Sequence, residues 1–239
     1  MGHKVHPKAF RLFTTATWSS RWFADDRHYR VYLEQDVRIR RELRARFREA
    51  GVAEVVVERS ANAVTVTMHA ARPGVIIGRG GQGAEGLKRE LRERFFRGVK
   101  NPPALQLNII EVDRPALNSE VVLQQVAAEI EKRLPFRRVM RQAIGRVERA
   151  GAQGVRIQMS GRLNGAEIAR RETAMSGSVP LHTLRADVQY AQGFASTMYG
   201  AIGIKVWIYR GEVFANKQRE RTAERAPAVG RRAAAPAAA

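Results

Sequence analysis

Cysteine is absent from this 239-residue chain, which excludes disulfide bonds and thiolate-bound zinc. No apolar run approaches the roughly 18 residues of a membrane-spanning helix, and the sequence has no signal-peptide core. The five histidines are scattered, and none forms a metal-binding pair at helical spacing in an acidic setting. We therefore expect no metal, no cofactor and no membrane partner.

Acidic residues are scarce: 23 Asp and Glu stand against 42 Lys and Arg, which gives a net charge of +19 and a pI near 11.4. Such an excess of one sign repels itself in a compact fold unless a polyanion neutralises it. Nucleic acid is therefore the expected partner, with an acidic membrane surface as the rival polyanion. The length leaves room for one large domain or two small ones.

Glycine is concentrated in one stretch, Val75–Gln82, with Gly78, Arg79, Gly80 and Gly81 at its centre. Apolar residues precede this centre and a helical pattern follows it. A loop that leads into a helix N-terminus presents free N–H groups and the positive end of the helix dipole, which together bind phosphate. The stretch resembles the I-I-G-x-x-G segment of the KH family, which clamps about four nucleotides.

Two other interpretations of this stretch remain. A glycine cluster can simply be a turn. Gly78, Gly80 and Gly83 also spell G-x-G-x-x-G, a dinucleotide-binding fingerprint. That fingerprint needs a buried strand before it and an acidic residue about 20 positions later. The apolar run after Gly74 is too short for such a strand, and the first acid that closes a strand-like run is the distant Glu111. We therefore favour RNA over a dinucleotide.

The first half of the chain supports this interpretation through its order of elements. A basic arm rich in aromatics precedes a helical pattern at 31–50, in which Val37, Leu43 and Phe47 are expected to face a core. The arm is expected to be extended, and its aromatics could stack on bases, anchor on a neighbour or lie on their own domain. The later elements are strands at 55–57 and 64–68, a short helix, the glycine loop, a helix at 84–96 and a strand at 105–112. This order is that of the type II KH fold.

The second half reads as another α+β unit beginning near Asp113–Pro115. Asn118 can cap a helix that carries Val122, Val126 and Ile130, and Pro135 suits the first turn of the next helix. Alternating apolar residues then predict strands at 155–159, 184–188 and 202–208. We expect two helices on an antiparallel sheet, followed by a disordered basic tail rich in alanine.

The helix expected at 136–150 has an apolar side and a basic side. At 100° per residue its apolar residues fall on one side, while Arg137, Arg138, Arg141 and Arg149 share an arc of about 120° on the other. Only Glu148 interrupts this arc. A solvated helix face more often interleaves charges of both signs, so this arrangement favours phosphate contact over a merely solvated surface.

Six sequence segments, which occur in the same order as in one protein family, give the chain a closer resemblance. They are Met1–Pro7, Trp18–Ala24, Ala71–Gly78, Ser160–Arg170, Val179–Asp187 and Tyr199–Trp207. With them the chain resembles the family of bacterial small-subunit ribosomal protein three over residues 1 to about 211. The resemblance implies an α/β (α+β) protein with four parts: a basic arm at 1–16, a type II KH domain at 17–112, a second α+β domain at 113–211 and the tail at 212–239.

The resemblance also implies a function. It suggests a structural, non-enzymatic protein of the small-subunit head, which binds small-subunit rRNA and neighbouring head proteins and takes no small-molecule substrate. A basic cluster of the family at the mRNA entry channel, which helps to unwind messages passively, matches Arg137, Arg138 and Arg141. We add Arg162, within one of the matching segments, to the expected RNA-binding residues, and expect a ribosomal location in a bacterial cytoplasm or an organelle.

The glycine loop of this chain departs from the pattern of the family that it resembles. The family often has two basic residues inside the glycine loop, whereas this chain has Arg79 followed by Gly80. The slope of log affinity for RNA against log salt concentration should therefore be smaller by up to about one unit.

A free KH regulator of mRNA and a nucleotide-dependent enzyme are the rival functions. Ser160, His182 and Asp187 include the residue types of a catalytic triad, but the G-x-S-x-G elbow is missing and we expect no catalytic site.

Overall fold

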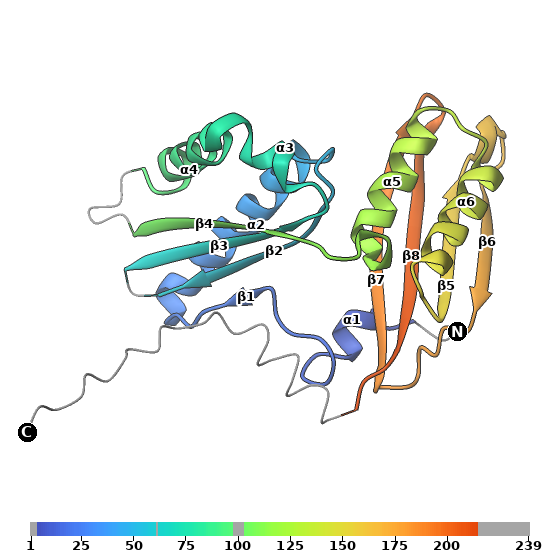
Figure 1. Ribbon diagram of the computed structural model, residues 1–239, viewed down its shortest axis with the longest axis horizontal. Coiled ribbons are helices and arrows are strands. Elements are labelled where there is room, and N and C mark those ends of the chain that lie inside the picture. The colour runs from blue at the N-terminus through green and yellow to red at the C-terminus, as the bar shows by residue number, and fades with distance from the viewer. Residues whose placement is uncertain (1–3, 61, 98–102, 215–239) are drawn as a thin grey trace, which may run out of the picture.

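The computed structural model describes residues 4–60, 62–97 and 103–214, which form two α/β domains side by side (Figure 1). The first domain contains four strands: β1 (Ser20–Arg21), β2 (Val52–Arg59), β3 (Ala63–Ala70) and β4 (Ala104–Glu111). Its helices are α2 (Asp26–Arg46), α3 (Pro73–Ile77) and α4 (Gln82–Phe95). From α2 onwards, the order of elements is the one expected for a type II KH domain.

The sheet of the first domain has the order β1-β2-β3-β4, with β2 and β3 antiparallel and β3 and β4 parallel. β3 alternates strictly, so that Val64, Val66 and Met68 are buried while the residues between them are half-exposed. The buried residues of all three helices pack with these side chains in one core. One face of the sheet is therefore covered by helices.

Two expectations about the long helix α2 are wrong. The helix begins at Asp26 rather than near Val31, and Val37 is exposed instead of facing the core. Ile39 and Leu43 make the core contact, and the expected Phe47 packs partly against it.

The third inward residue of α2 is the fully buried Asp36. Its carboxylate accepts hydrogen bonds from Ser20 Oγ at 2.9 Å, Trp22 Nε1 at 2.8 Å and Arg59 Nε at 3.0 Å. A buried charge is tolerated only when it is paired and hydrogen-bonded, and Asp36 meets both conditions. The network ties β1 and β2 to α2, and it places Trp22 on its own domain.

The second domain has two helices on a four-stranded antiparallel sheet. The helices are α5 (Ser119–Glu131) and α6 (Phe136–Arg149), and the strands are β5 (Gly154–Gly161), β6 (Arg170–Gly177), β7 (Ala186–Thr197) and β8 (Gly200–Glu212). The strand order is β6-β5-β8-β7. Asn118 caps α5 as expected, since its side chain accepts hydrogen bonds from the N–H groups of Glu120 and Val121.

Sequence patterns missed one strand of this sheet and misplaced another. β6 carries polar residues at most positions because it lies at the sheet edge, so no apolar alternation marks it. The strand expected at 184–188 begins at Ala186 and continues to Thr197. Gly193 and the small residues Ala191 and Ala195 on its core side hide the alternation, and a Cβ on Gly193 would lie 2.8 Å from a methyl carbon of Leu123 on α5.

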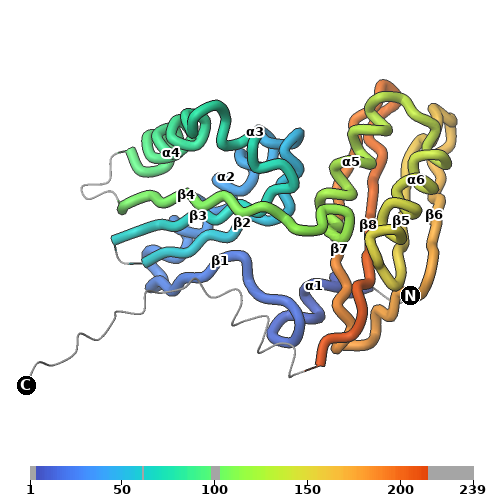
Figure 2. The backbone as a smooth tube through the Cα atoms, viewed as in Figure 1, coloured from blue at the N-terminus to red at the C-terminus, as the bar shows by residue number. Residues whose placement is uncertain are grey.

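The N-terminal arm is not fully extended, since it contains the short helix α1 (Pro7–Phe10). Figure 2 follows the chain from this helix, beside the second domain, back to β1 in the first domain. Arg11 is 1% exposed, and its guanidinium donates to the carbonyl oxygens of Pro7, Pro180, Leu181, Thr183 and Ala186. Burial lowers the pKa of Arg11, and the charge of Asp187 partly offsets this.

Further contacts join the two domains and hold the segment that connects them. The side chain of Gln124 on α5 donates to the carbonyl oxygen of Val52 on β2 at 2.9 Å, and Lys8 of the arm pairs with Glu54 at 3.0 Å. Arg210 on β8 donates to the carbonyl oxygen of Leu117 in the connecting segment at 3.0 Å. The expected disordered tail lies outside the described residues from 215 onwards, and β8 itself runs to Glu212.

Candidate nucleic-acid interface

The glycine stretch forms an exposed loop between α3 and α4. Gly78, Gly80 and Gly81 have φ angles of 69°, 62° and 81°, a region that glycine enters without the strain other residues incur. No heavy atom lies within 4 Å of the position that a Cβ would take on Gly80 or Gly81. A phosphate backbone can therefore approach this part of the loop without meeting protein side chains.

The loop also supplies hydrogen-bond donors and charge. Gly81 is the N-cap of α4 and provides no side-chain cap, so the first N–H groups of the helix lack the partner that Ser or Asp would give. Arg79 is exposed and forms no ion pair with any described residue. The N–H of Gln82, the first of the helix, donates to the carbonyl oxygen of Arg79. A cation beside a helix N-terminus that has no side-chain cap is a suitable binding site for a phosphate oxygen. The loop joins two helices, whereas a dinucleotide fingerprint would follow a buried strand.

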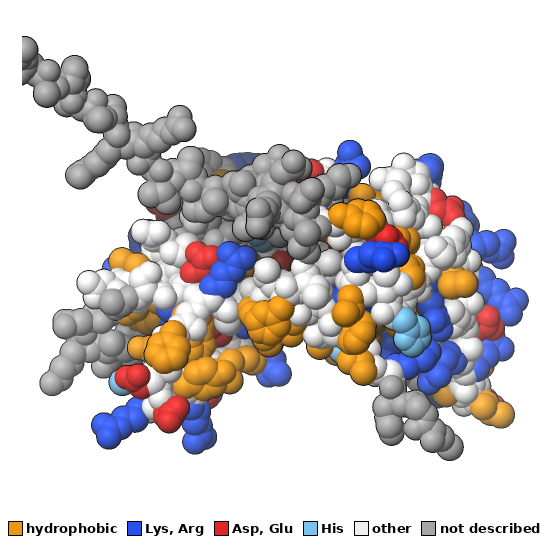
Figure 3. All heavy atoms as spheres, turned by 90° about the horizontal axis from the view of Figure 1, so that it is seen from below, with side chains coloured by type: hydrophobic (Ala, Val, Ile, Leu, Met, Phe, Trp, Pro, Cys, Tyr) orange, Lys and Arg blue, Asp and Glu red, His pale blue; other side chains and the backbone are white. Residues whose placement is uncertain are grey.

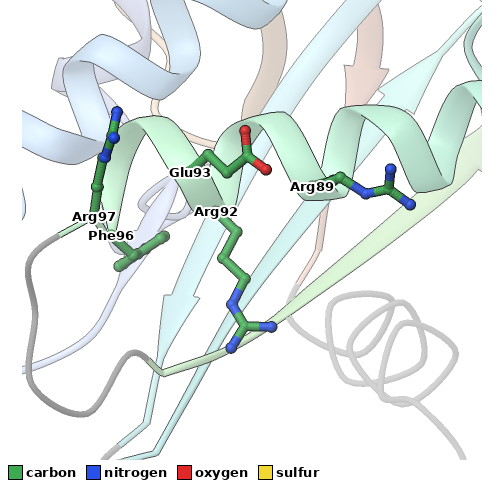
Figure 4. A pocket seen from close by; sticks show the side chains of 5 residues that line it. All are labelled: Arg89, Arg92, Glu93, Phe96 and Arg97. Atoms are coloured by element: carbon green, nitrogen blue, oxygen red, sulfur yellow. The ribbon is translucent and has the colours of Figure 1, made fainter.

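A second basic feature lies further along α4, where Arg89, Arg92, Glu93, Phe96 and Arg97 line a cavity of about 610 Å³. Figure 4 shows that Arg92 leaves the helix toward the start of β4, while Arg97 points the opposite way. No sequence pattern sets these arginines apart, because they alternate with glutamates along the helix. Three arginines and one glutamate line this cavity, so its lining carries a net positive charge.

The arginines of α6 lie as the helical pattern predicted. Phe136, Val139, Met140, Ala143 and Val147 are buried in the core, and Arg137, Arg138, Arg141 and Arg149 are exposed on the other side of the helix. Within the described part of the chain, neither Arg138 nor Arg141 forms an ion pair. Arg149 donates only to the Gly145 carbonyl oxygen of its own helix at 3.0 Å. We call these four side chains the α6 arginine face.

The edge strand β6 adds residues to this face that the sequence analysis missed. Glu172 lies 3.3 Å from Arg137 and 3.9 Å from Arg170, so one carboxylate is shared by two guanidiniums. The guanidinium carbons of Arg137 and Arg170 are also 5.7 Å and 5.8 Å from the centroid of the Phe136 ring. The pairing with Glu172 removes part of the positive charge of Arg137 and leaves the charges of Arg138 and Arg141 uncompensated.

Arg162, the last expected RNA-binding residue, lies apart from the α6 arginine face on the segment after β5. It is exposed, donates to the Ala166 carbonyl oxygen at 2.9 Å and lies 5.7 Å from the centroid of the Tyr199 ring. The glycine loop is in the other domain, and in Figure 1 α5 lies between it and α6. The expected residues therefore form separate surfaces rather than one site.

Aromatic side chains of the N-terminal segment are exposed near α1 and β1. Seen from below in Figure 3, hydrophobic side chains gather in patches across this side of the molecule. Phe13, Trp18 and Phe23 are among the exposed aromatics, and the rings of Phe13 and Trp18 meet edge to face at 6.1 Å. This side of the molecule offers apolar surface to a neighbouring molecule.

In the part of the chain that the structure describes, neither a metal site nor a membrane span accompanies these surfaces. The described residues contain no group of three or more His, Asp or Glu side chains placed to hold a metal ion. No described helix is both long and apolar enough to cross a membrane.

Comparison with known proteins agrees with this architecture. A KH domain model matches residues 38–117, and a model described as "Ribosomal protein S3, C-terminal domain" matches residues 126–208. The chain is 44% identical over 220 residues to small ribosomal subunit protein uS3 of Carboxydothermus hydrogenoformans, which covers 92% of this chain and 96% of the relative. It is 47% identical to uS3 of Xanthomonas oryzae, over 90% of this chain and 85% of the relative. It is 43% identical to uS3 of a Picosynechococcus species, over 95% and 93%. The chain therefore belongs to the uS3 family of structural, non-enzymatic proteins of the small ribosomal subunit.

Proposed function

We propose that this protein binds small-subunit rRNA in the head of the subunit, and that its α6 arginine face holds mRNA at the entry channel and helps to unwind it passively. The observation that carries this proposal is the placement of four exposed arginines on one side of a helix whose other side is fixed in the core. The core contacts hold the helix rigid. The guanidiniums are therefore presented as a fixed array of charge.

The proposed action needs no chemical turnover. Guanidinium groups bind phosphate oxygens by charge-assisted hydrogen bonds, which position a strand without reading its sequence. An array that holds the separated strands of a message after thermal opening would slow their re-pairing. Arg138 and Arg141 are the most effective candidates, because their charge is not shared with a described carboxylate.

The glycine loop would serve a second role in the same protein. Its open backbone at Gly80 and Gly81 and the unpaired charge of Arg79 fit a sugar-phosphate backbone of rRNA. Neighbouring head proteins are the proposed partners of the exposed aromatics Phe13, Trp18 and Phe23. Specificity would then come from RNA shape and from these protein contacts, since phosphate contacts alone carry no sequence information.

The test is to replace Arg137, Arg138 and Arg141 by glutamine and to measure translation of matched messages with and without a stable hairpin in the coding region. A matched control replaces Arg27, Arg30 and Arg41 of α2, which are also exposed and remove the same charge from another surface. We expect the α6 variant to join small subunits normally and to slow only the hairpin message, by several-fold. Failure of the variant to enter subunits would make the face an rRNA site. Equal slowing by the control would reduce the effect to net charge.

A further inference from the structure

The sheet of the second domain has two faces with different surroundings. Val155, Ile157 and Met159 of β5 point into the core beneath α5 and α6. The residues between them point to the other side of the sheet, together with their partners in the ladders. We call this second side the open sheet face. Its residues include Arg156, Gln158, Ser160, Arg171, Thr173, Met175, Tyr190, Gln192, Phe194, Ser196, Ala201, Gly203, Lys205 and Trp207.

The N-terminal arm covers only one part of the open sheet face. Trp207 and Tyr190 pack in a small cluster with Val179 and Leu181, and the ring of His6 meets Tyr190 edge to face at 4.7 Å. Burial raises the pKa of Tyr190, as expected beneath this cover. Beyond Tyr190 along β7, Gln192 and Phe194 are exposed, and Phe194 is 63% exposed.

Strand register gives Phe194 only small residues as its neighbours across the sheet. Its ladder partner on β8 is Gly203, which carries no side chain, and the next residue across the sheet is Ser160. A flat group can therefore lie against the aromatic ring on the side of these small residues. Phe194 is also the kind of platform on which any base can stack, since every base has a π-face.

Cations and amides lie on the same face of the sheet as this aromatic side chain. Arg171 on β6 pairs with Ser160 and so lies in the same row across the sheet as Phe194. The adjacent row across the four strands consists of Thr173, Gln158, Lys205 and Gln192. Arg156 is held over the Trp207 ring at 5.1 Å, where the arm begins to cover the sheet. None of the strand residues named for the open sheet face is Asp or Glu. These strand residues of the face therefore carry positive charge only, and the carboxylate of Glu131, which accepts a hydrogen bond from the N–H of Ser196 at 3.4 Å, lies at the β7 edge.

We propose that the uncovered part of the open sheet face binds single-stranded RNA, with a base stacked on Phe194 and the adjoining phosphates near Lys205 and Arg171. This contact goes beyond the proposed function, because it engages a base rather than only phosphates and lies on the opposite side of the sheet from α6. The exposed apolar groups would suit a protein partner equally well, but cations without strand carboxylates beside them would not. Charge complementarity favours the polyanion.

The direct test is photo-crosslinking of the full-length protein to a single-stranded RNA that carries 5-iodouridine, followed by mass spectrometry of the linked peptides. We expect a crosslink at Phe194 that single-stranded competitor RNA removes and double-stranded RNA does not. Phe23 is the internal control: it is 92% exposed, yet it precedes Asp25 and Asp26 and should not be linked. No linkage at Phe194, or equal linkage at both residues, overturns the proposal.

Variants supply the second measurement, in which binding of a fluorescent twelve-nucleotide RNA is followed by anisotropy at several salt concentrations. Phe194→Ala should weaken binding about tenfold with an unchanged salt slope, while Phe194→Tyr keeps the affinity. Lys205→Gln should reduce the slope by about one unit. Affinity that is unchanged in Phe194→Ala, with loss of a neighbouring protein from small subunits, would make the open sheet face a protein interface and contradict the proposal.

Discussion

Gly83 sets the distance between the two helices that flank the glycine loop. A Cβ on this residue would lie 2.7 Å from the carbonyl oxygen of Ile76 and 2.9 Å from that of Ile77. Both atoms belong to the backbone and cannot turn aside. Gly83→Ala should therefore lower the free energy of unfolding by about 1–3 kcal/mol, in the range of overpacking. Chemical unfolding of the purified protein measures this change.

Gly86→Ala is the matched control, since it lies one turn along the same helix with no heavy atom within 4 Å of its Cβ position. It should raise the free energy of unfolding by up to about 1 kcal/mol, because alanine favours the helix. A loss of stability in both variants would show that α4 tolerates no added methyl group. A gain in both would contradict the close approach at Gly83.

Single residues also show where prediction from sequence fails. The glycine positions of the loop were predictable, because glycine at a turn before a helix has a local physical reason. The burial of Asp36 was not, because a carboxylate on an amphipathic helix ordinarily faces water. Its partners Ser20, Trp22 and Arg59 lie between 14 and 23 residues away along the chain and meet Asp36 only in the fold. The same holds for Glu172, which approaches Arg137 from a strand that carries no apolar pattern.

At the scale of elements, the arm depends on one buried cation. Arg11 donates to five backbone carbonyl oxygens, four of them in the segment 180–186. A lysine in its place has three donors from one nitrogen and cannot satisfy so dispersed a set. We expect both Arg11→Met and Arg11→Lys to free the arm from the second domain rather than to unfold the protein.

Amide hydrogen exchange measures this release. The N–H groups of Phe10 and Ala16, which bond to the carbonyl oxygens of His6 and Arg11, should lose protection by about tenfold or more in both variants. Arg38→Met, at an exposed arginine of α2, should leave them unchanged. Full protection in Arg11→Lys would mean that charge alone holds the arm.

Elements with a strong period were predicted well, and elements without one were not. The apolar and basic sides of α6 follow from a period of 3.6 residues. Both its core contacts and its arginine face could therefore be predicted. The edge strand β6 and the core side of β7 lack a comparable pattern, since the first is polar and the second uses small residues. The open sheet face could be recognised only once these strands were paired in register.

At the scale of the whole molecule, the junction between the domains contains a carboxyl group sensitive to pH. Burial raises the pKa of Glu120, although Arg44, 3.9 Å away, acts in the opposite direction. A raised pKa in the folded state means that the folded protein binds a proton more readily than the unfolded chain. Glu120 therefore contributes stability at low pH, and this contribution is lost as pH rises from the ordinary glutamate range through the raised value.

Glu120→Gln removes this titration. Unfolding of both proteins should be measured from about pH 4 to pH 8. The free energy of unfolding of the unchanged protein, minus that of the variant, should fall as pH rises through the window and be constant above it. A difference that is flat throughout, or that rises with pH, would contradict the effect of burial on Glu120.

Sedimentation of the tagged protein from a cell lysate through a sucrose gradient tests the central claim, that the protein works as a built-in part of the small subunit. The gradient should be run at low salt and again at about 0.5 M, where association through charge alone falls by orders of magnitude. The unchanged protein and the variant with Arg137, Arg138 and Arg141 replaced should both migrate with the small subunit at both salts. Protein that stays at the top of the low-salt gradient would contradict the claim and favour a free RNA-binding regulator.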